Sequence, residues 1–524
     1  MIVISLPTLA EITAGQLIVA ANNTSLSIDD LVIDDLVTDS RAIDKNSTKI
    51  SAFLALKGPN FDGHRFAQQV IEQGCQLLIV DHHLSEVIDT AQLVVSDTRI
   101  ALGKIAAYVK KELAPKTVAI TGSSGKTTVK EMVAAILSRL GKVLATQGNF
   151  NNDIGVPLTL LRLDSSHDFA VIEMGANHLG EIAYTTALTQ PDVAVINNIA
   201  AAHLEGFGDL CGVARAKGEI FSGLGEHGVA LYNQDSQYSD KWQWRLEGKA
   251  VRTFSCINSS PEGKAHCYSE NVNLDENGYA TFTLKTTQGS CDIHLTVPGK
   301  HNVCNAVAAA CIALEFGASL DDICLGLAKM QPVKGRLNLY QLHDKKTACH
   351  IKLIDDSYNA NLESAKAAAQ LLSSYPGKKI LILGDMAELG TDARSYHQEL
   401  GEFAKSLQLN TLLSLGVLSQ SASDAFAKDN DQSEQSQHFS QRAELMAHLL
   451  TMLNQQLSAG QQDIAILVKG SRSAHMEHVV TEITHWFEQM NSQESPNQAM
   501  NVSKENNASE NMNASKNQCK EGKA

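Results

Sequence analysis

The residues best suited to chemistry in this sequence lie in a short loop, residues 121–128. The loop contains Thr121, Gly122, Ser123, Ser124, Gly125, Lys126, Thr127 and Thr128. Its small residues would let backbone N–H groups surround a polyphosphate, Lys126 would add a mobile positive charge, and Thr127 would present its hydroxyl to Mg2+. The loop is not a full G-x-x-x-x-G-K-[ST] sequence, because Ile120 stands in place of the first glycine. We predict a nucleotide-phosphate site, with a plain strand-to-helix turn as the alternative.

Three further polar residues lie downstream, and each could also have an ordinary structural role. Glu173 ends an apolar run, where a carboxylate can bind Mg2+ directly or through water, or can cap the surface. His203 follows another strand-like run, and an isolated histidine is more often structural than a ligand. Lys217 falls on a predicted helix, where a solvated lysine is the usual case. The nearby phosphate loop favours a metal role for Glu173, whereas nothing in the local sequence favours one for Lys217.

The elements around the loop indicate a mainly parallel α/β sheet. Residues 117–120 are strand-like and lead directly into the loop, and residues 129–140 have the apolar spacing of a helix, with Gly141 placed to cap its end. Two more apolar runs, residues 169–172 and 193–196, end in polar residues. Ligands of a parallel sheet gather at the carboxyl ends of its strands, so we expect the site at that edge.

The chain of 524 residues is too long for one hydrophobic core, and its patterns predict three α/β domains and a tail. The predicted divisions are residues 1–114, 115–331, 332–490 and 491–524. The first contains strand-like runs at 52–56 and 77–80, and the third at 379–383, 411–415 and 464–468. The tail is rich in Asn, Ser, Glu and Lys and nearly lacks large apolar residues, so we expect it to be disordered.

The composition excludes several classes of protein. The formal net charge of -15 opposes binding to nucleic acids and anionic membranes. The ten cysteines lack metal-site spacing and the density of a disulfide scaffold, so we expect small core residues in a reducing compartment. The N-terminus has no basic leader or cleavage site, and no apolar run approaches the roughly 20 residues that span a bilayer. We expect a cytoplasmic protein without nucleic-acid partners or membrane insertion.

Taken together, the motifs resemble the Mur ligase family of peptidoglycan synthesis. The matching segments are residues 121–128, 148–157 and 173–177, the region around His203, Lys217, and residues 299–302, 335–336, 355–361 and 469–472. They follow the family's order from about residue 38 to residue 477 and leave only the tail uncovered. The match is closest to the branch of the family that adds a dipeptide.

The resemblance implies an N-terminal domain that binds a UDP-sugar, a central ATPase domain, and a Rossmann-like C-terminal domain that closes over the nucleotide. The implied substrate contacts are Ser40, Arg41, Asn149, Asn151 and Asn152, with further contacts from residues 61–64. From the residues alone, Ser40 and Arg41 belong to an ordinary turn, and the three asparagines belong to a polar loop.

The resemblance also implies nucleotide contacts in the second half of the chain. Asn302, with Asn305, would serve the nucleotide side, Arg336 would lie near the phosphates, and Asp356 near the ribose. From the residues alone, the asparagines could instead cap a helix, Arg336 could be a surface charge, and Asp356 could belong to a strand-end turn.

The resemblance further implies that Lys217 is carbamylated by carbon dioxide, which turns a cation into a carboxylate. The implied metal-binding residues are Thr127, Glu173, His203 and carbamylated Lys217, and the implied catalytic residues are Lys126, Glu173, His203 and Lys217.

The implied reaction joins D-alanyl-D-alanine to UDP-N-acetylmuramoyl-tripeptide and consumes ATP. The substrate carboxylate would attack the γ-phosphorus, with Lys126 and Mg2+ neutralising charge, and the dipeptide amine would then displace phosphate from the acyl phosphate. Residues 385–389 and 469–472 follow strands of the C-terminal domain. They are candidate contacts for the dipeptide or for the closing interface, or else ordinary turns. We expect the protein to act as a monomer.

Three other functions stay open. A ligase that adds the third, diamino acid residue would share the N-terminal and central motifs, although its typical Asp-Asn-Pro-Arg string is absent here. Folylpolyglutamate synthase shares the central chemistry but lacks a separate UDP-sugar domain ahead of the loop, so the segment 1–114 argues against it. A nucleotide-dependent switch would release ADP without forming an amide.

Overall fold

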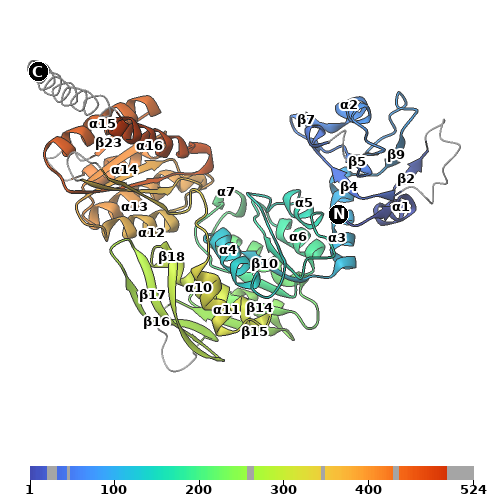
Figure 1. The fold of residues 1–524 in the computed structure, drawn as a ribbon, viewed down its shortest axis with the longest axis horizontal. Coiled ribbons are helices and arrows are strands. Elements are labelled where there is room, and N and C mark those ends of the chain that lie inside the picture. The colour runs from blue at the N-terminus through green and yellow to red at the C-terminus, as the bar shows by residue number, and fades with distance from the viewer. Residues whose placement is uncertain (20–31, 44–47, 257–264, 344–348, 429–435, 493–524) are drawn as a thin grey trace, which may run out of the picture. The chain divides into compact units, whose positions relative to one another are not determined.

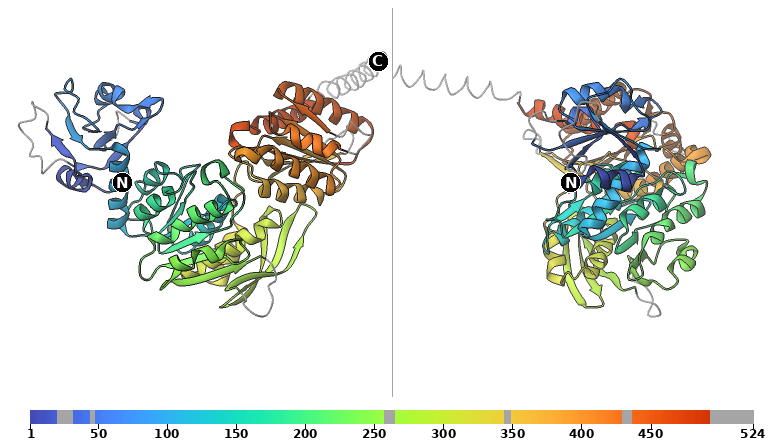
Figure 2. Two further views of the ribbon diagram at one scale, coloured as in Figure 1. Left: turned by 180° about the vertical axis from the view of Figure 1, so that it is seen from behind. Right: turned by 90° about the vertical axis from the view of Figure 1, so that its right-hand side faces the viewer.

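A computed structural model describes residues 1–19, 32–43, 48–256, 265–343, 349–428 and 436–492. Contacts divide the chain into two units: unit 1 comprises Met1–Pro332 and Glu388–Asp392, and unit 2 comprises Val333–Ala387 and Ala393–Ala524. Helices and strands alternate in both units, which confirms the α/β class (Figures 1 and 2). Within the described ranges, no helix is both long and apolar enough to cross a membrane.

The N-terminal part of unit 1 is built on a sheet that contains five strands within the described residues. Across the sheet the strands are β2 (Gln16–Ile18), β9 (Ala91–Val94), β8 (Leu77–Val80), β5 (Ser51–Leu54) and β4 (Asp35–Val37). Two short pairs are separate from it: β1 (Ile4–Ser5) pairs with β3 (Val32–Ile33), and β6 (Lys57–Gly58) pairs with β7 (Phe61–Asp62). All neighbours in the sheet are parallel except β2 and β9. The predicted strands at 52–56 and 77–80 are confirmed as β5 and β8. The helices are α1 (Leu6–Thr13), α2 (Ala67–Glu72) and α3 (Thr98–Leu113).

The remainder of unit 1 is organised around a larger sheet, of nine strands in the described part. In spatial order they are β11 (Val143–Ala145), β12 (Phe169–Glu173), β10 (Lys116–Thr121), β13 (Val193–Ile196), β14 (Val229–Asn233), β15 (Ala250–Ser255), β16 (Cys267–Leu274), β17 (Tyr279–Thr286) and β18 (Gly289–Pro298). Pairing is parallel from β11 to β16 and antiparallel from β16 to β18. The predicted strands at 117–120, 169–172 and 193–196 are confirmed, and their carboxyl ends share one edge.

Helices pack around this sheet. They are α4 (Lys126–Leu137), α5 (Gly155–Leu160), α6 (Glu181–Thr189), α7 (Leu204–Phe207), α8 (Leu210–Gly218), α9 (Gln243–Leu246), α10 (His301–Glu315) and α11 (Leu320–Ala328). The predicted end of α4 is wrong: Ser138 closes the helix, and Gly141 is not its cap. A side chain at Gly141 would collide with the Asp168 carboxylate, which accepts the Lys142 amide at 2.8 Å. Glycine is therefore required there for space.

Unit 2 contains a third large sheet, and six of its strands are described. Their order is β19 (Asn338–His343), β20 (His350–Asp356), β24 (Asp463–Lys469), β21 (Lys378–Gly384), β22 (Thr411–Leu415) and β23 (Ser436–Phe439), and only β19 is antiparallel to its neighbour. The predicted strands at 379–383, 411–415 and 464–468 are confirmed. Helices α15 (Arg442–Ser458) and α16 (Glu477–Ser492) pack on one face, and α12 (Leu362–Ser373), α13 (Ala393–Ser406) and α14 (Gln420–Ala427) form another layer (Figure 1).

The predicted tail, residues 491–524, falls almost entirely outside the described residues. Helix α16 includes its first part, up to Ser492. The predicted domain boundaries at 114 and 331 stay predictions, although the division into units at Pro332 lies beside the second.

The prediction that the cysteines are small core residues is wrong for several of them. Cys256 and Cys304 form a disulfide with a Cα–Cα distance of 5.0 Å. Cys211 is exposed, and Cys291 and Cys324 are half-buried. The spacing along the chain could not reveal this pair, because the two cysteines lie 48 positions apart and meet only through the sheet.

We predict that His397 makes unit 2 sensitive to mild acid. His397 is buried, its Nδ1 donates to the Ala393 carbonyl at 2.7 Å, and its Nε2 accepts the Met386 amide at 2.9 Å. Burial lowers the pKa of His397 below its usual 6.5. Below pH 6.5 the unfolded chain therefore binds more protons than the native state, and stability falls as pH falls.

Comparison with His397→Gln isolates this effect, since glutamine can keep one donor and one acceptor without titrating. Unfolding measured from pH 7.5 to 5.5 should show a steeper loss of stability in the wild type, by up to about 1.4 kcal/mol per pH unit. Parallel pH profiles for the two proteins would contradict the prediction.

Candidate functional site

The predicted phosphate loop joins β10 to α4 and is held in shape by two asparagines that follow β13. Asn198 accepts the Ser123 amide on its carbonyl at 3.0 Å and the Ser124 amide on its Oδ1 at 2.8 Å. Asn197 Nδ2 donates to the Ser124 carbonyl at 3.0 Å. Sequence reasoning interpreted these two asparagines only as the polar residues that end a strand. The amides of Ser123 and Ser124 are thus already engaged within the protein.

Gly125 is the N-cap residue directly before α4 and adopts the left-handed conformation, with φ of 76°. A side chain there would collide with the Asn305 amide, so close approach as well as backbone conformation requires glycine. The next residue, Lys126, donates from Nζ to the Gly122 carbonyl at 2.8 Å. The loop therefore brings a lysine and a helix N-terminus together, as the sequence predicted.

Glu173 ends β12 directly beside the loop, because parallel pairing sets Ile120 opposite Glu173. Only 2% of Glu173 is exposed. Asn151 Nδ2 donates to its Oε1 at 2.8 Å. Its other oxygen, Oε2, is buried and accepts no hydrogen bond from any described residue. A buried carboxylate oxygen in that condition favours a cation as its partner.

Lys217 is buried, contrary to the usual case of a solvated helix lysine. It lies on α8 with 1% exposure, and its Nζ stands 5.8 Å from the centre of the Phe207 ring. Burial, and then the positive charge of Lys126, hold the pKa of Lys217 well below its usual 10.5. The structure thus brings Lys217 close to the phosphate loop and favours its neutral amine.

His203 lies near Lys217 through a shared aromatic neighbour, since its ring is 6.4 Å from that of Phe207 in an edge-on arrangement. It adopts the left-handed conformation, with φ of 56°. Its Nδ1 lies 2.5 Å from Oε2 of Glu388, a residue of unit 1 by its contacts. The bond to His203 holds the pKa of Glu388 below its usual 4.5. His203 is therefore paired with a carboxylate in this structure.

The predicted nucleotide residue Asn302 connects to the phosphate loop through a series of amides. Asn302 Nδ2 donates to the Pro298 carbonyl at 2.7 Å, and Asn305 Nδ2 donates to Asn302 Oδ1 at 2.8 Å. Asn305 Oδ1 in turn accepts from Asn197 Nδ2 at 3.0 Å. The first turn of α10 is thereby tied to the loop that it faces.

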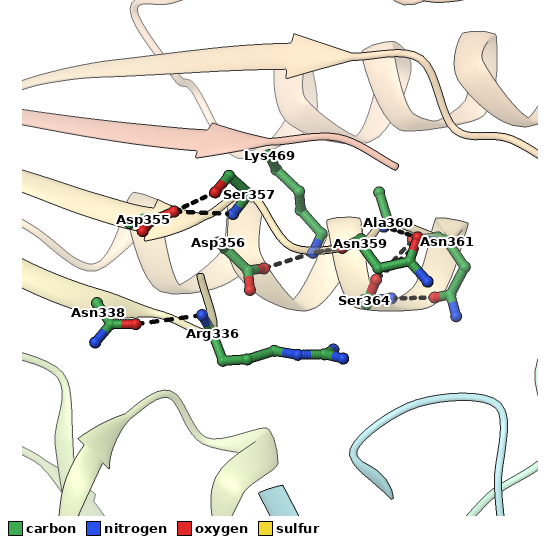
Figure 3. Close-up of polar contacts among 10 residues, drawn as sticks. All are labelled: Arg336, Asn338, Asp355, Asp356, Ser357, Asn359, Ala360, Asn361, Ser364 and Lys469. Atoms are coloured by element: carbon green, nitrogen blue, oxygen red, sulfur yellow. Dashed lines mark hydrogen bonds and ion pairs between the residues drawn. The ribbon is translucent and has the colours of Figure 1, made fainter. Parts of the chain in front are cut away.

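In unit 2, Asp356 and Lys469 form a buried ion pair at neighbouring strand ends (Figure 3). The register of β20 and β24 sets them opposite each other, with 2.5 Å between Lys469 Nζ and Asp356 Oδ2. Burial lowers the pKa of Lys469, although Asp356 opposes that shift. The predicted residue Arg336 stacks on Tyr358, with its guanidinium carbon 4.4 Å from the ring centre. Sequence reasoning identified Asp356 but not that Lys469 is its partner.

The predicted substrate residues are dispersed. Arg41 is exposed and pairs with Asp39 at 2.7 Å within the turn that contains Ser40. Asn152 Oδ1 accepts the Gly155 amide at 2.8 Å, and the Asn149 carbonyl accepts the Asn151 amide at 2.7 Å. Only Asn151 contacts Glu173 among the hydrogen bonds of these described residues. Their roles as substrate contacts stay predictions.

Asp385, the first residue of the candidate segment 385–389, has a structural role. Its carboxylate accepts the amides of Val417, Leu418 and Ser419 at 2.8 to 3.2 Å. Although burial raises the pKa of Asp385, these bonds outweigh it and hold the pKa below its usual 3.8. The turn interpretation therefore suits Asp385 itself.

Comparison with known proteins identifies the family. The Mur ligase middle domain matches residues 120–313, and the glutamate ligase domain of Mur ligases matches residues 335–472. The UDP-N-acetylmuramoyl-tripeptide–D-alanyl-D-alanine ligase of Escherichia coli (strain K12) is 48% identical over 428 residues, which cover 82% of this chain and 89% of that protein. The chain belongs to the Mur ligase family.

Solved structures agree with this assignment. A crystal structure of MurF from Acinetobacter baumannii matches with a TM-score of 0.80 and 38% identity, covering 92% of this chain and 98% of that one. MurF from Thermotoga maritima, solved in complex with ADP, matches with a TM-score of 0.72 and 25% identity, covering 87% and 98%. The three-domain architecture is confirmed, and this Mur ligase is an ATP-dependent ligase.

Two residues that sequence reasoning missed hold Glu173 of this Mur ligase in position. Thr146 Oγ1 accepts the Glu173 amide at 2.9 Å, and the Thr146 carbonyl accepts from Lys130 Nζ at 2.6 Å. Lys130 is 2% exposed although it lies on α4. The available signal was the position of Lys130 next to Val129 and one helical turn before Val133, among the apolar residues of the predicted helix.

We predict that Thr146→Val lowers the ligase activity about 10- to 100-fold, because the Glu173 amide loses its acceptor and the carboxylate shifts. The Mg2+ concentration needed for half-maximal activity should rise, and Thr146→Ser should retain most activity. Thr189→Val is a matched control, since its buried hydroxyl donates to the Thr185 carbonyl at 2.8 Å and, among the described residues, makes no other hydrogen bond. Equal activity and Mg2+ dependence in Thr146→Val and the wild type would contradict the role of Thr146.

Proposed function

We propose that this Mur ligase joins D-alanyl-D-alanine to UDP-N-acetylmuramoyl-tripeptide, with ATP as the second substrate. The products are UDP-N-acetylmuramoyl-pentapeptide, ADP and phosphate. The observation that carries the proposal is the similarity to the Escherichia coli ligase of that name, which spans most of both chains. The missing Asp-Asn-Pro-Arg string supports the same choice over a ligase for the third residue.

ATP is proposed to bind with its phosphates at the start of α4. The helix amides and Lys126 supply positive charge there, whereas Ser123 and Ser124 shape the loop by donating to Asn198. The ADP bound to the related Thermotoga maritima protein supports a nucleotide in this chain as well. Asn302, Arg336 and Asp356 are the other proposed nucleotide contacts; a guanidinium such as that of Arg336 suits phosphate oxygens.

Mg2+ suits the site because Glu173 offers a buried carboxylate oxygen that accepts no bond from the described residues. We propose Glu173 and Thr127 as its ligands. When bound, the ion supplies positive charge against the phosphoryl oxygens. Metal binding by His203 would require its pair with Glu388 to open.

Lys217 suits carbamylation, since only an unprotonated amine attacks carbon dioxide. Burial and the charge of Lys126 lower the pKa of Lys217 and so favour that amine. In the reaction an N–C bond forms, one proton leaves, and the product carries a negative charge. The repulsion between Lys126 and Lys217 thereby becomes an attraction, which stabilises the carbamate.

The protein contributes to the ligation reaction mainly by positioning the reacting groups rather than by covalent catalysis. The tripeptide carboxylate attacks the γ-phosphorus, an O–P bond forms, and ADP leaves. Lys126 neutralises charge on the transferring oxygens. The dipeptide amine attacks the acyl carbon and loses a proton, and the C–O bond to phosphate breaks.

The remaining expectations form part of the same proposal. Residues 1–114 bind the UDP-muramoyl group through Ser40 and Arg41, residues 115–331 bind ATP, and residues 332–490 complete the ligase. Asn149, Asn151 and Asn152 face the substrate. The protein acts as a monomer in the cytoplasm.

The substrates provide the direct test. With ATP and Mg2+, phosphate release should require UDP-N-acetylmuramoyl-tripeptide and D-alanyl-D-alanine together, and mass spectrometry should detect the pentapeptide. Omitting either substrate is the control. Amide formation from the dipeptide precursor and a free diamino acid would instead identify the third-residue ligase. Phosphate release without any amide would identify a switch.

We predict that Lys217→Ala lowers kcat about 100-fold or more and that a short carboxylic acid such as acetate restores part of it, because the acid returns the missing negative charge. Labelled bicarbonate should give a carbamate carbon signal by NMR in the wild type but not in the variant. Lys130→Ala, another buried lysine, is the matched control that acetate should not rescue. Full activity of Lys217→Ala without acid would reject the carbamate.

A further inference from the structure

The Cys256–Cys304 pair lies at the same edge of the large sheet as the phosphate loop. Cys256 follows β15, whose neighbours toward the loop are β14, β13 and β10, all parallel. Cys304 lies in the first turn of α10. Their Cα atoms are 5.0 Å apart, which is within the range that a disulfide requires. Both residues are half-buried, so a small oxidant or reductant can reach them.

Polar groups fix both ends of this pair. The Cys256 amide donates to Asp235 Oδ2 at 2.7 Å, and Asn233 Nδ2 lies 4.0 Å from the sulfur of Cys256 and 3.7 Å from that of Cys304. Asn233 is the last residue of β14. The backbone around the two sulfurs is therefore positioned by the sheet rather than by the bond alone.

Cys304 lies between Asn302 and Asn305 on α10. Those two amides lead through Asn197 to the Ser124 carbonyl of the phosphate loop. A covalent link at Cys304 consequently restrains the helix turn that carries this series of amides.

Three of the other described cysteines have thiol pKa values that disfavour oxidation. Burial raises the pKa of Cys75 to about 11 and that of Cys291 to about 12. The neighbouring Cys267 thiol, and then burial, raise the pKa of Cys311 well above its usual 9.0. Because the thiolate is the form that attacks oxidants, a raised pKa disfavours oxidation of these three residues.

We propose that Cys256 and Cys304 form a reversible oxidation site that restrains α10 against the phosphate loop. On oxidation one S–S bond forms, and the two thiols lose two protons and two electrons. A low-molecular-weight disulfide accepts them and is reduced to two thiols, or hydrogen peroxide accepts them and becomes two waters. A dithiol reductant reverses the reaction.

The first test is selectivity in the full-length protein. After complete reduction and brief treatment with oxidised glutathione, peptide mapping should find the 256–304 link before any other disulfide. Unfolding should shift upward by about 5–10 °C in the oxidised protein, because the link closes a 48-residue separation. The shift should vanish on reduction and be absent in Cys256→Ser, whereas the matched variant Cys291→Ser should keep it. Another disulfide forming first, or no link forming, would overturn the proposal.

The second test concerns α10 and rests on the proposed nucleotide site. ADP should bind about threefold more tightly to the oxidised protein. The disulfide already orders the first turn of α10, so binding loses less conformational entropy. Equal or weaker binding would overturn the restraint of α10. If neither form binds ADP, the nucleotide proposal fails. The restraint of α10 is then tested by the unfolding shift and by the protection of α10 amides from hydrogen exchange in the oxidised protein.

Discussion

The burial of a lysine amine is the constraint on which the site in unit 1 depends. Lys217 is 1% exposed and lies near Lys126, and the described residues give it no ion pair. A neighbouring positive charge and burial both disfavour the protonated form of a lysine. Burial, and then the charge of Lys126, lower the pKa of Lys217 and favour its neutral amine, while Lys126 Nζ donates to the Gly122 carbonyl. This difference supports the proposal that Lys126 contacts phosphate and that the Lys217 amine reacts with carbon dioxide.

Parallel pairing explains how such residues meet. The register places Ile120 opposite Glu173 and Thr121 opposite Ile196. The start of the phosphate loop therefore lies at the same level of the sheet as Glu173 and Asn197. Thr146 and Lys130 then fix Glu173, and Asn198 fixes the loop. Unit 2 repeats the principle on its own sheet, where Asp356 and Lys469 meet at adjacent strand ends. Both sheets concentrate charge where strands end.

The local sequence pattern predicted most of the strands and helices, but few of the contacts that hold the site residues in place. Apolar runs predicted the strands around the loop correctly, the strand end beside the loop indicated Glu173, and the family resemblance indicated Lys217. Sequence could not reveal that Lys217 is buried, because its surroundings come from α7 and from the loop. Nor could it pair Thr146 with Glu173 or Lys469 with Asp356, since those bonds depend on register between distant strands. The end of α4 was missed because the steric demand at Gly141 comes from Asp168.

The central claim is that the γ-phosphate activates a carboxylate, and the fate of one oxygen tests it most directly. UDP-N-acetylmuramoyl-tripeptide labelled with 18O in its terminal carboxylate should be ligated with ATP and D-alanyl-D-alanine, and the released phosphate analysed by mass spectrometry. The account predicts one 18O atom in phosphate for each amide formed, because the carboxylate oxygen leaves bound to phosphorus. Amide formation with unlabelled phosphate would contradict it.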